Sequence, residues 1–310
     1  MVAASELPID TGASAQEMAE AIFGDGTTVT GATYYGNNAA SGIYSDANTV
    51  SPGVAPADEG VILSTGRARD FTNSSGQANQ SDSTSTNVRG GIDNFSGFND
   101  LAGVTTFDGS VLDVFFVPTG DTLTLQFTFA SEEYPEYSNS IFNDVVGIWV
   151  NGQQAEITVG DGQTSVGSLN QTTNENLYVD NTASQYNTEM DGFTVTLTVK
   201  ADVNAGETNS LRLGIADAGD TAYDSNLLIA AGSAQTSLVA ADDSVTLAPG
   251  GSKTIDVLDN DSAPGGVTLT VTHINNIAVS PGDSVVLTTG EEVTLNADGT
   301  LTLEADAGEE

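Results

Sequence analysis

The feature that most constrains the fold is a strict alternation of apolar and polar side chains at residues 122–129. The apolar positions are Leu123, Leu125, Phe127 and Phe129, and the positions between them are Thr or Gln. Successive side chains of a β-strand point to opposite faces of the sheet, so this pattern predicts a strand with one buried and one solvated face. Such strands are typical of antiparallel sheets. The alternation recurs at residues 193–199, through Phe193, Val195, Leu197 and Val199.

Other short apolar runs extend this prediction along the chain. We expect further strands at residues 27–35, 61–65, 111–117, 145–150, 210–215 and 227–231. Hydrophobic residues make up 38% of the chain and come in bursts separated by Gly, Asn, Asp, Ser and Thr, which suits β-sandwiches better than helical bundles. Residues 72–91 are rich in Ser, Asn and Gly and predict a long loop.

One helix is expected near the N-terminus. Ser14 and Glu17 form a capping box at its start, and Met18 and Ile22 share an apolar stripe. Gly24 stands where a C-cap glycine belongs. The predicted fold class is all-β: an antiparallel, jelly-roll-like β-sandwich with one short N-terminal helix. A smaller, incomplete Ig-like or cadherin-like β-sandwich follows it.

The charge of the chain limits its partners. Forty-three acidic residues face six basic ones, so the net charge is −37. Such a chain is repelled by nucleic acid and by anionic membrane surfaces. Self-repulsion also destabilises a compact state unless salt or cations offset it. Two interpretations remain open and can hold together: a solvated acidic coat suited to saline surroundings, and carboxylate cages for divalent cations.

The chain has no Cys, and its one His is His273. Disulfides, Cys/His zinc sites and any Ser-His-Asp triad confined to residues 1–239 are therefore excluded. We predict that the chain is not an enzyme. Its first ten residues show no signal peptide, and it has no run of 18 apolar residues, so we expect an export signal beyond residue 310 and no membrane insertion.

Acidic residues gather in two stretches that follow predicted strands. We expect both to be loops, and if they share one end of the sandwich their carboxylates converge. Like charges so close need a cation, and calcium accepts carboxylate and amide oxygens. The alternative is a network of hydrogen-bonded carboxylates that cap turns. The candidate calcium ligands are Glu132, Glu133, Glu136, Asn143 and Asp144 in the first stretch and Asp217, Asp220 and Asp224 in the second.

A third acidic group lies near the C-terminus. Asp256, Asp259 and Asp261, with Asn260 between them, are candidate calcium ligands, and Asp242 and Asp243 stand at a predicted domain seam. Calcium at such seams stiffens a chain of modules. The alternative is turn chemistry, because Asp and Asn cap turns with their own side chains.

Several stretches resemble the choice-of-anchor L domain of bacteria. They are Phe-Ala-Ser-Glu-Glu-Tyr-Pro-Glu-Tyr at 129–137, Phe-Asn-Asp-Val at 142–145, Leu-Arg-Leu-Gly-Ile-Ala-Asp-Ala-Gly-Asp-Thr-Ala-Tyr-Asp-Ser at 211–225, Gly-Val-Ile-Leu-Ser-Thr-Gly at 60–66 and Phe-Val-Pro-Thr-Gly-Asp at 116–121. The resemblance covers about residues 20–235. It implies an extracellular β-sandwich module of large surface or secreted proteins, and it says little about mechanism.

The remaining part resembles the cadherin-like or bacterial Ig-like repeats of RTX-type adhesins. The matching residues are 241–243, 255–261, 269–271 and 293–301. The repeat stops at Glu310 before its expected last strands, so we expect the natural chain to continue. The predicted domains are residues 1–238 and 239–310.

Sugar chemistry remains an alternative. A carbohydrate-active enzyme needs two carboxylates flanking one bond, and a pair from different loops, such as Glu133 with Asp217, could supply them. Tyr134 and Tyr137 beside the acidic loop are candidates for stacking on a sugar, whereas we predict Trp149 to be core.

These observations favour a secreted or cell-surface, calcium-dependent adhesion or matrix module of a larger bacterial protein. The alternatives are a self-assembling subunit of an extracellular filament or sheath, and a lectin or carbohydrate-active enzyme. The expected partners are an extracellular surface, a glycan or matrix ligand, or copies of the chain itself.

Overall fold

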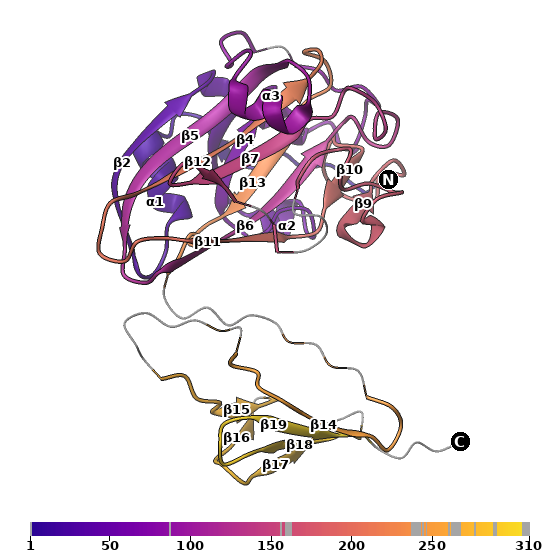
Figure 1. The fold of residues 1–310 in the computed structure, drawn as a ribbon. Helices are drawn as coiled ribbons and strands as arrows, with labels where there is room; N and C mark the ends of the chain where they lie inside the picture. The colour runs from indigo at the N-terminus through magenta and orange to yellow at the C-terminus, as the bar shows by residue number, and fades with distance from the viewer. Residues whose placement is uncertain are drawn as a thin grey trace. The chain divides into compact units, whose positions relative to one another are not determined.

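The chain divides into two compact units, Met1–Thr236 and Ser237–Glu310, in this computed structural model (Figure 1). The structure describes residues 2–86, 88–155, 157–158, 163–236, 243, 245, 247–259, 261, 268–275, 277–287 and 290–305. In these residues, no helix is long and apolar enough to cross a membrane.

The described residues of the larger unit form two antiparallel sheets. The first sheet has the order β1 (Ile9–Asp10), β3 (Ser41–Tyr44), β4 (Gly60–Ser64), β13 (Ser225–Ala230), β6 (Thr122–Ser131), β10 (Gly192–Thr194) and β9 (Tyr178–Asp180), and β11 (Leu197–Asp202) also pairs with β6. The second has the order β2 (Thr27–Tyr35), β5 (Thr106–Pro118), β12 (Asn209–Ala218), β7 (Val145–Val150) and β8 (Gln153–Gln154). The predicted all-β class is confirmed.

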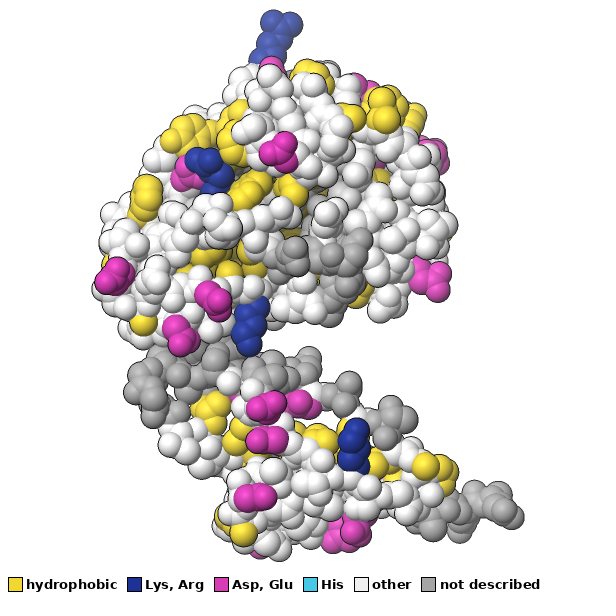
Figure 2. All heavy atoms as spheres, in the orientation of Figure 1, with side chains coloured by type: hydrophobic (Ala, Val, Ile, Leu, Met, Phe, Trp, Pro, Cys, Tyr) yellow, Lys and Arg dark blue, Asp and Glu magenta, His cyan; other side chains and the backbone are white. Residues whose placement is uncertain are grey.

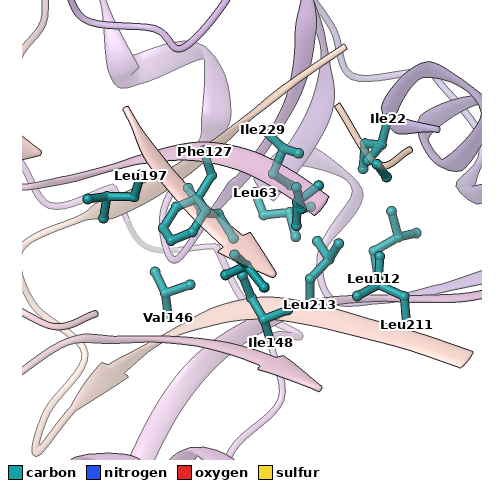
Figure 3. Packing of buried hydrophobic residues seen from close by; sticks show 14 of the residues in the cluster. Ile22, Leu63, Leu112, Phe127, Val146, Ile148, Leu197, Leu211, Leu213 and Ile229 are labelled. Carbon is teal, nitrogen blue, oxygen red and sulfur yellow. The ribbon is translucent and has the colours of Figure 1, made fainter. Parts of the chain in front are cut away.

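The two sheets pack face to face over one apolar core. The alternation in β6 buries Phe127 and Phe129 on the face that meets the second sheet, as the sequence predicts. The predicted solvated face is wrong for Thr124 and Thr128, which are buried on the opposite face, where loops and further strands cover the sheet. Leu211 and Leu213 of β12 meet them from the other side (Figure 3). Burial of apolar side chains between two sheets is the main stabilising contribution of a β-sandwich.

Three α-helices accompany the sheets in the described residues: α1 (Ala15–Ile22), α2 (Ala47–Val50) and α3 (Ser96–Ala102). Short 3-10 helices span Asn38–Ala40, Ala68–Phe71 and Glu175–Leu177. The capping box of α1 is confirmed, with Ser14 and Glu17 each bonding the backbone N–H of the other. The prediction of a single helix is wrong, because α2 and α3 are too short and irregular to show helical periodicity.

Gly24 does not cap α1 as predicted. The C-cap is Phe23 in an extended conformation, and Gly24 lies outside the left-handed region. A side chain at Gly24 would drive its Cβ into the carbonyl oxygen of Gly232. The glycine is therefore required by a close backbone approach.

Residues 193–199 form two strands, β10 and β11, instead of the single predicted one. Val195 lies between them and is 38% exposed, while Phe193 and Leu197 are buried. The backbone N–H of Val195 donates to the carbonyl of Leu177 (2.9 Å), so the chain leaves the regular ladder at this point. Alternation alone does not reveal such an interruption.

The smaller unit carries an antiparallel sheet in the order β14 (Ser252–Ile255), β19 (Leu301–Glu304), β18 (Glu292–Leu295) and β17 (Ser284–Val286). A separate pair is formed by β15 (His273–Ile274) and β16 (Ile277–Ala278). Ile274, Val285, Val293 and Leu295 form its own small core.

Candidate functional site

The two acidic stretches of the larger unit meet at one end of the sandwich. The first is the loop from β6 to β7, and the second includes the end of β12 and the loop to β13. The backbone N–H of Glu132 donates to the carbonyl of Asp224 (3.1 Å), and that of Ala218 donates to Asp144 Oδ1 (2.9 Å). Antiparallel pairing of β13 with β6 brings these strand ends together.

Four of these side chains form a group that we term the inner cluster: Glu133, Asp144, Asp217 and Asp220. Asp144 is buried, and its Oδ2 accepts a hydrogen bond from Ser225 Oγ (2.6 Å). Its carboxyl group also contacts that of Asp217. Glu133 and Asp220 lie close enough for their charges to act on each other.

Burial raises the pKa values of three carboxyl groups of the inner cluster, Glu133, Asp144 and Asp217. The pKa of Glu133 is raised to about 9 by burial and by the charges of Asp144 and Asp220. That of Asp144 is raised to about 7, mainly by burial. Burial and the charge of Asp144 also raise the pKa of Asp217 well above its ordinary value.

Two oxygens of the inner cluster are left without hydrogen bonds. Glu133 is 1% exposed and Asp217 is 3% exposed. Glu133 Oε2 and Asp217 Oδ1 have no hydrogen-bond partner among the residues that the structure describes. A buried unpartnered oxygen is costly, so these two atoms need a proton or a cation that the protein itself does not supply.

Asp224 fits the alternative interpretation, a hydrogen-bonded network, and Glu132 fits it through one of its two carboxylate oxygens. Asp224 accepts hydrogen bonds from the backbone and side chain of Thr86. A Cβ at Gly66 would overlap Asp224 Oδ2, so only glycine leaves room for this carboxylate. Glu132 Oε1 accepts from the backbone N–H of Thr84 (2.6 Å). The second Glu132 oxygen, Oε2, is buried and has no hydrogen-bond partner in the described part of the chain.

The remaining candidates of the first stretch stand apart from the inner cluster. Glu136 is exposed to solvent. The side chain of Asn143 faces a neighbouring loop, where its Oδ1 accepts from the backbone N–H of Gly167 (2.5 Å).

The acidic group near the C-terminus adopts turn geometry. Asp256 Oδ1 accepts from the backbone N–H of Leu258 (3.1 Å), and the carbonyl of Leu258 accepts from the N–H of Asp261 (3.2 Å). Asp256, Asp259 and Asp243 are exposed. Asp242 and Asn260 lie outside the described residues.

Within the described ranges, no set of three or more His, Cys, Asp and Glu side chains is arranged to hold a metal ion. The inner cluster would have to draw its carboxylates closer to do so. Sequence reasoning also missed two further buried carboxylates, those of Glu189 and Asp191, and the second of these acts on Glu132. They lie in a region without periodic pattern, and nothing in the sequence connects them with the acidic loops.

The tyrosines beside the acidic loop differ in exposure. Tyr134 is fully buried and its hydroxyl donates to the carbonyl of Leu169 (2.5 Å), so the prediction that it could stack on a sugar is wrong. Tyr137 is half-buried, and its ring packs on that of Tyr223, with centroids 5.5 Å apart.

A groove of about 470 Å³ lies elsewhere on the larger unit, over β5, β7 and β12. Its aromatic residues are Phe95, Phe115 and Trp149, and Arg212 at its side makes a 2.6 Å ion pair with Asp113. Trp149, predicted to be core, is only half-buried. On the face seen in Figure 2, apolar side chains reach the surface of the larger unit, and basic side chains are few and scattered.

Fold and charge define an acidic, all-β protein of two units. The chain belongs to the choice-of-anchor L domain family, which matches residues 8–235, and residues 235–310 match a bacterial Ig domain. No curated protein and no solved structure shows significant similarity to the chain. The two families are found in cell-surface or extracellular modules, and they are not enzyme families.

Proposed function

We propose that the chain is a calcium-stabilised adhesion module of a secreted or cell-surface bacterial protein. The observation that carries this proposal is the inner cluster, where Glu133 Oε2 and Asp217 Oδ1 are buried without a hydrogen-bond partner in the described residues. The charged groups that act on Glu133, Asp144 and Asp217 are themselves carboxylates.

Two species can relieve this accumulation of negative charge. Protons do so when the pH is below the raised pKa values, and the cost then grows as the pH rises. A calcium ion does so at neutral pH, because it takes six to eight oxygen ligands and tolerates irregular geometry. Glu133 and Asp217 would bind the ion through their unpartnered oxygens, and Asp220 lies on the more exposed side.

Calcium binding would also suit an adhesion module. Acidic surfaces keep long secreted chains apart, and cations screen that repulsion. An ion that holds the β6–β7 loop and the end of β12 together would stiffen one end of the sandwich, where a ligand or another module can be presented.

Calcium titration by calorimetry on residues 1–310, with thermal melts in calcium and in chelator, tests this proposal. We expect binding and a melt raised by several degrees, with both reduced in Asp217→Asn. The matched control is Asp202→Asn, an exposed aspartate at the end of β11 that should leave binding unchanged. Absent binding and identical melts would reject the calcium site. Self-assembly of the chain, followed by sedimentation, would then be the function to test.

A second candidate function, glycan binding, is favoured by the groove over β5, β7 and β12. Phe115 is 53% exposed there, and solvent-exposed aromatic rings stack on sugars. The planar Arg212–Asp113 pair provides donors and acceptors for hydroxyl groups beside the rings. Binding to immobilised polysaccharides should be lost in Phe115→Ala and kept in Val195→Ala, an exposed apolar residue outside the groove. Equal binding by the two variants would exclude the groove.

A further inference from the structure

The long loop at residues 72–91 is held in place by buried carboxylates. It contains no strand or helix among its described residues, yet it donates hydrogen bonds to acidic side chains in segments that flank β6, β10 and β13. These acceptors are Glu189, Asp191, Glu132 and Asp224.

Each acceptor takes a different donor of the loop. The N–H of Gln80 donates to Glu189 Oε2 (3.0 Å), and Asn79 Nδ2 donates to Asp191 Oδ1 (2.7 Å). Further along the loop, the backbone N–H of Thr84 donates to Glu132, and the backbone N–H of Thr86 donates to Asp224. A segment too polar to pack on a core is therefore ordered by charge-assisted hydrogen bonds.

Two oxygens of the residues that form these hydrogen bonds remain unused. Glu132 Oε2 and Asn79 Oδ1 have no hydrogen-bond partner within the described ranges, although Glu132 is 2% exposed and Asn79 is 7% exposed. Asn79 is fixed at the Asp191 carboxylate by its own amide nitrogen. Both the backbone N–H and the charge of Asp191 act on Glu132, so Asp191 is a neighbour of both Glu132 and Asn79.

We propose that Glu132, Asp191 and Asn79 form a second cation site, which binds calcium and fastens the 72–91 loop to the sheet. Two carboxylates and one amide oxygen are ligands that calcium accepts, and backbone carbonyls or water complete its shell. The ion would balance charges that the loop's neutral donors leave uncompensated.

This site is separate from the inner cluster, although Glu132 and Glu133 are adjacent in the chain. Glu132 interacts with Thr84 and Asp191, whereas Glu133 interacts mainly with Asp144 and Asp220 and only more weakly with the charge of Glu132. The second site extends the proposed function without depending on the inner cluster.

Hydrogen–deuterium exchange of peptides from the loop, in calcium chloride and in chelator, tests the second site. The N–H groups of Gln80, Thr84 and Thr86 donate directly to the carboxylates and report on the docked loop. At a free calcium concentration ten times the dissociation constant, linkage predicts exchange about tenfold slower than in chelator. Identical exchange under the two conditions would overturn the proposal.

Variants assign the effect to this site. In Glu132→Gln and in Asn79→Gly, the loop amides should exchange at the same rate in calcium and in chelator. Glycine is chosen at position 79 because it suits the positive φ of this residue (44°). The matched control Asn73→Ala removes a loop contact to Glu189 and should keep the calcium effect. Asp217→Asn should also keep it. If Asp217→Asn abolishes the slowing, the ion belongs to the inner cluster and the second site is refuted.

Discussion

Replacing Glu132 by Gln should stabilise the calcium-free protein at neutral pH. Burial is the main cause that raises the pKa of Glu132 from 4.5 to about 9, and the charge of Asp191 adds to this rise. The folded pKa therefore lies above the unfolded one. Such a group favours folding at low pH, and this contribution is lost as the pH rises from about 4.5 through about 9.

The expected gain follows from this difference. At pH 7 Glu132 is ionised in the unfolded chain and protonated in the folded chain. Because pH 7 lies about 2.5 units above the ordinary pKa of Glu132, taking up this proton on folding costs about 3 kcal/mol. Gln is neutral in both states and keeps an oxygen for the N–H of Thr84. We expect the variant to be more stable by about 2–3 kcal/mol, or about 5–10 °C in Tm for a unit of this size.

Thermal melts in chelator between pH 4 and pH 8 measure this gain. The difference between wild type and Glu132→Gln should nearly vanish at pH 4, where Glu132 is protonated in both states. The control Glu136→Gln changes an exposed residue of the same loop and should alter stability by less than about 0.5 kcal/mol. An unchanged or lower Tm for Glu132→Gln at pH 7 would refute the reasoning.

Three further predictions concern the core, the loop and the inner cluster. Phe127→Ala should destabilise the larger unit by about 3–5 kcal/mol in urea unfolding, because the side chain is fully buried between the sheets. Gly66→Ala should cost about 1–3 kcal/mol in the same assay and speed exchange at Thr86, since its Cβ would displace the Asp224 carboxylate. Calcium binding at pH 7 should release protons, because the pKa of Glu133 is about 9. Calorimetry in buffers of different ionisation enthalpy measures this release.

The parts of the fold that the sequence predicts are those with a local physical signal. The alternation within β6 (Thr122–Ser131) places its apolar residues on the core face, and the pairing of Ser14 with Glu17 locates the start of α1. By contrast, α3 has no side-chain cap, and Phe98 is its one buried residue among those described. A short helix of this kind is stabilised by its contacts with β5 and β7, which a local pattern does not contain.

The candidate site shows the same difference between local signals, which the sequence contains, and long-range contacts, which it does not. The sequence left open whether the two acidic stretches meet. They do so because both connect one sheet with the other and β13 pairs with β6. The contribution of Asp191 could not be predicted, because Asp191 lies far from Glu132 in the chain and is held by Asn79 of a third segment. Long-range contacts of irregular segments depend on the complete fold.

The buried carboxylates bear on how the net charge of −37 is to be understood. A coat that only solvates the surface would leave its carboxylates in water, where each is stable without a partner. Among the described residues seven are buried instead: Glu132, Glu133, Asp144, Glu189, Asp191, Asp217 and Asp224. Hydrogen bonds from loop 72–91 account for Glu189 and Asp224 without an ion. The unpartnered oxygens of Glu132, Glu133 and Asp217 are not explained by a solvated coat, whereas the proposed calcium sites would give each of them a ligand role.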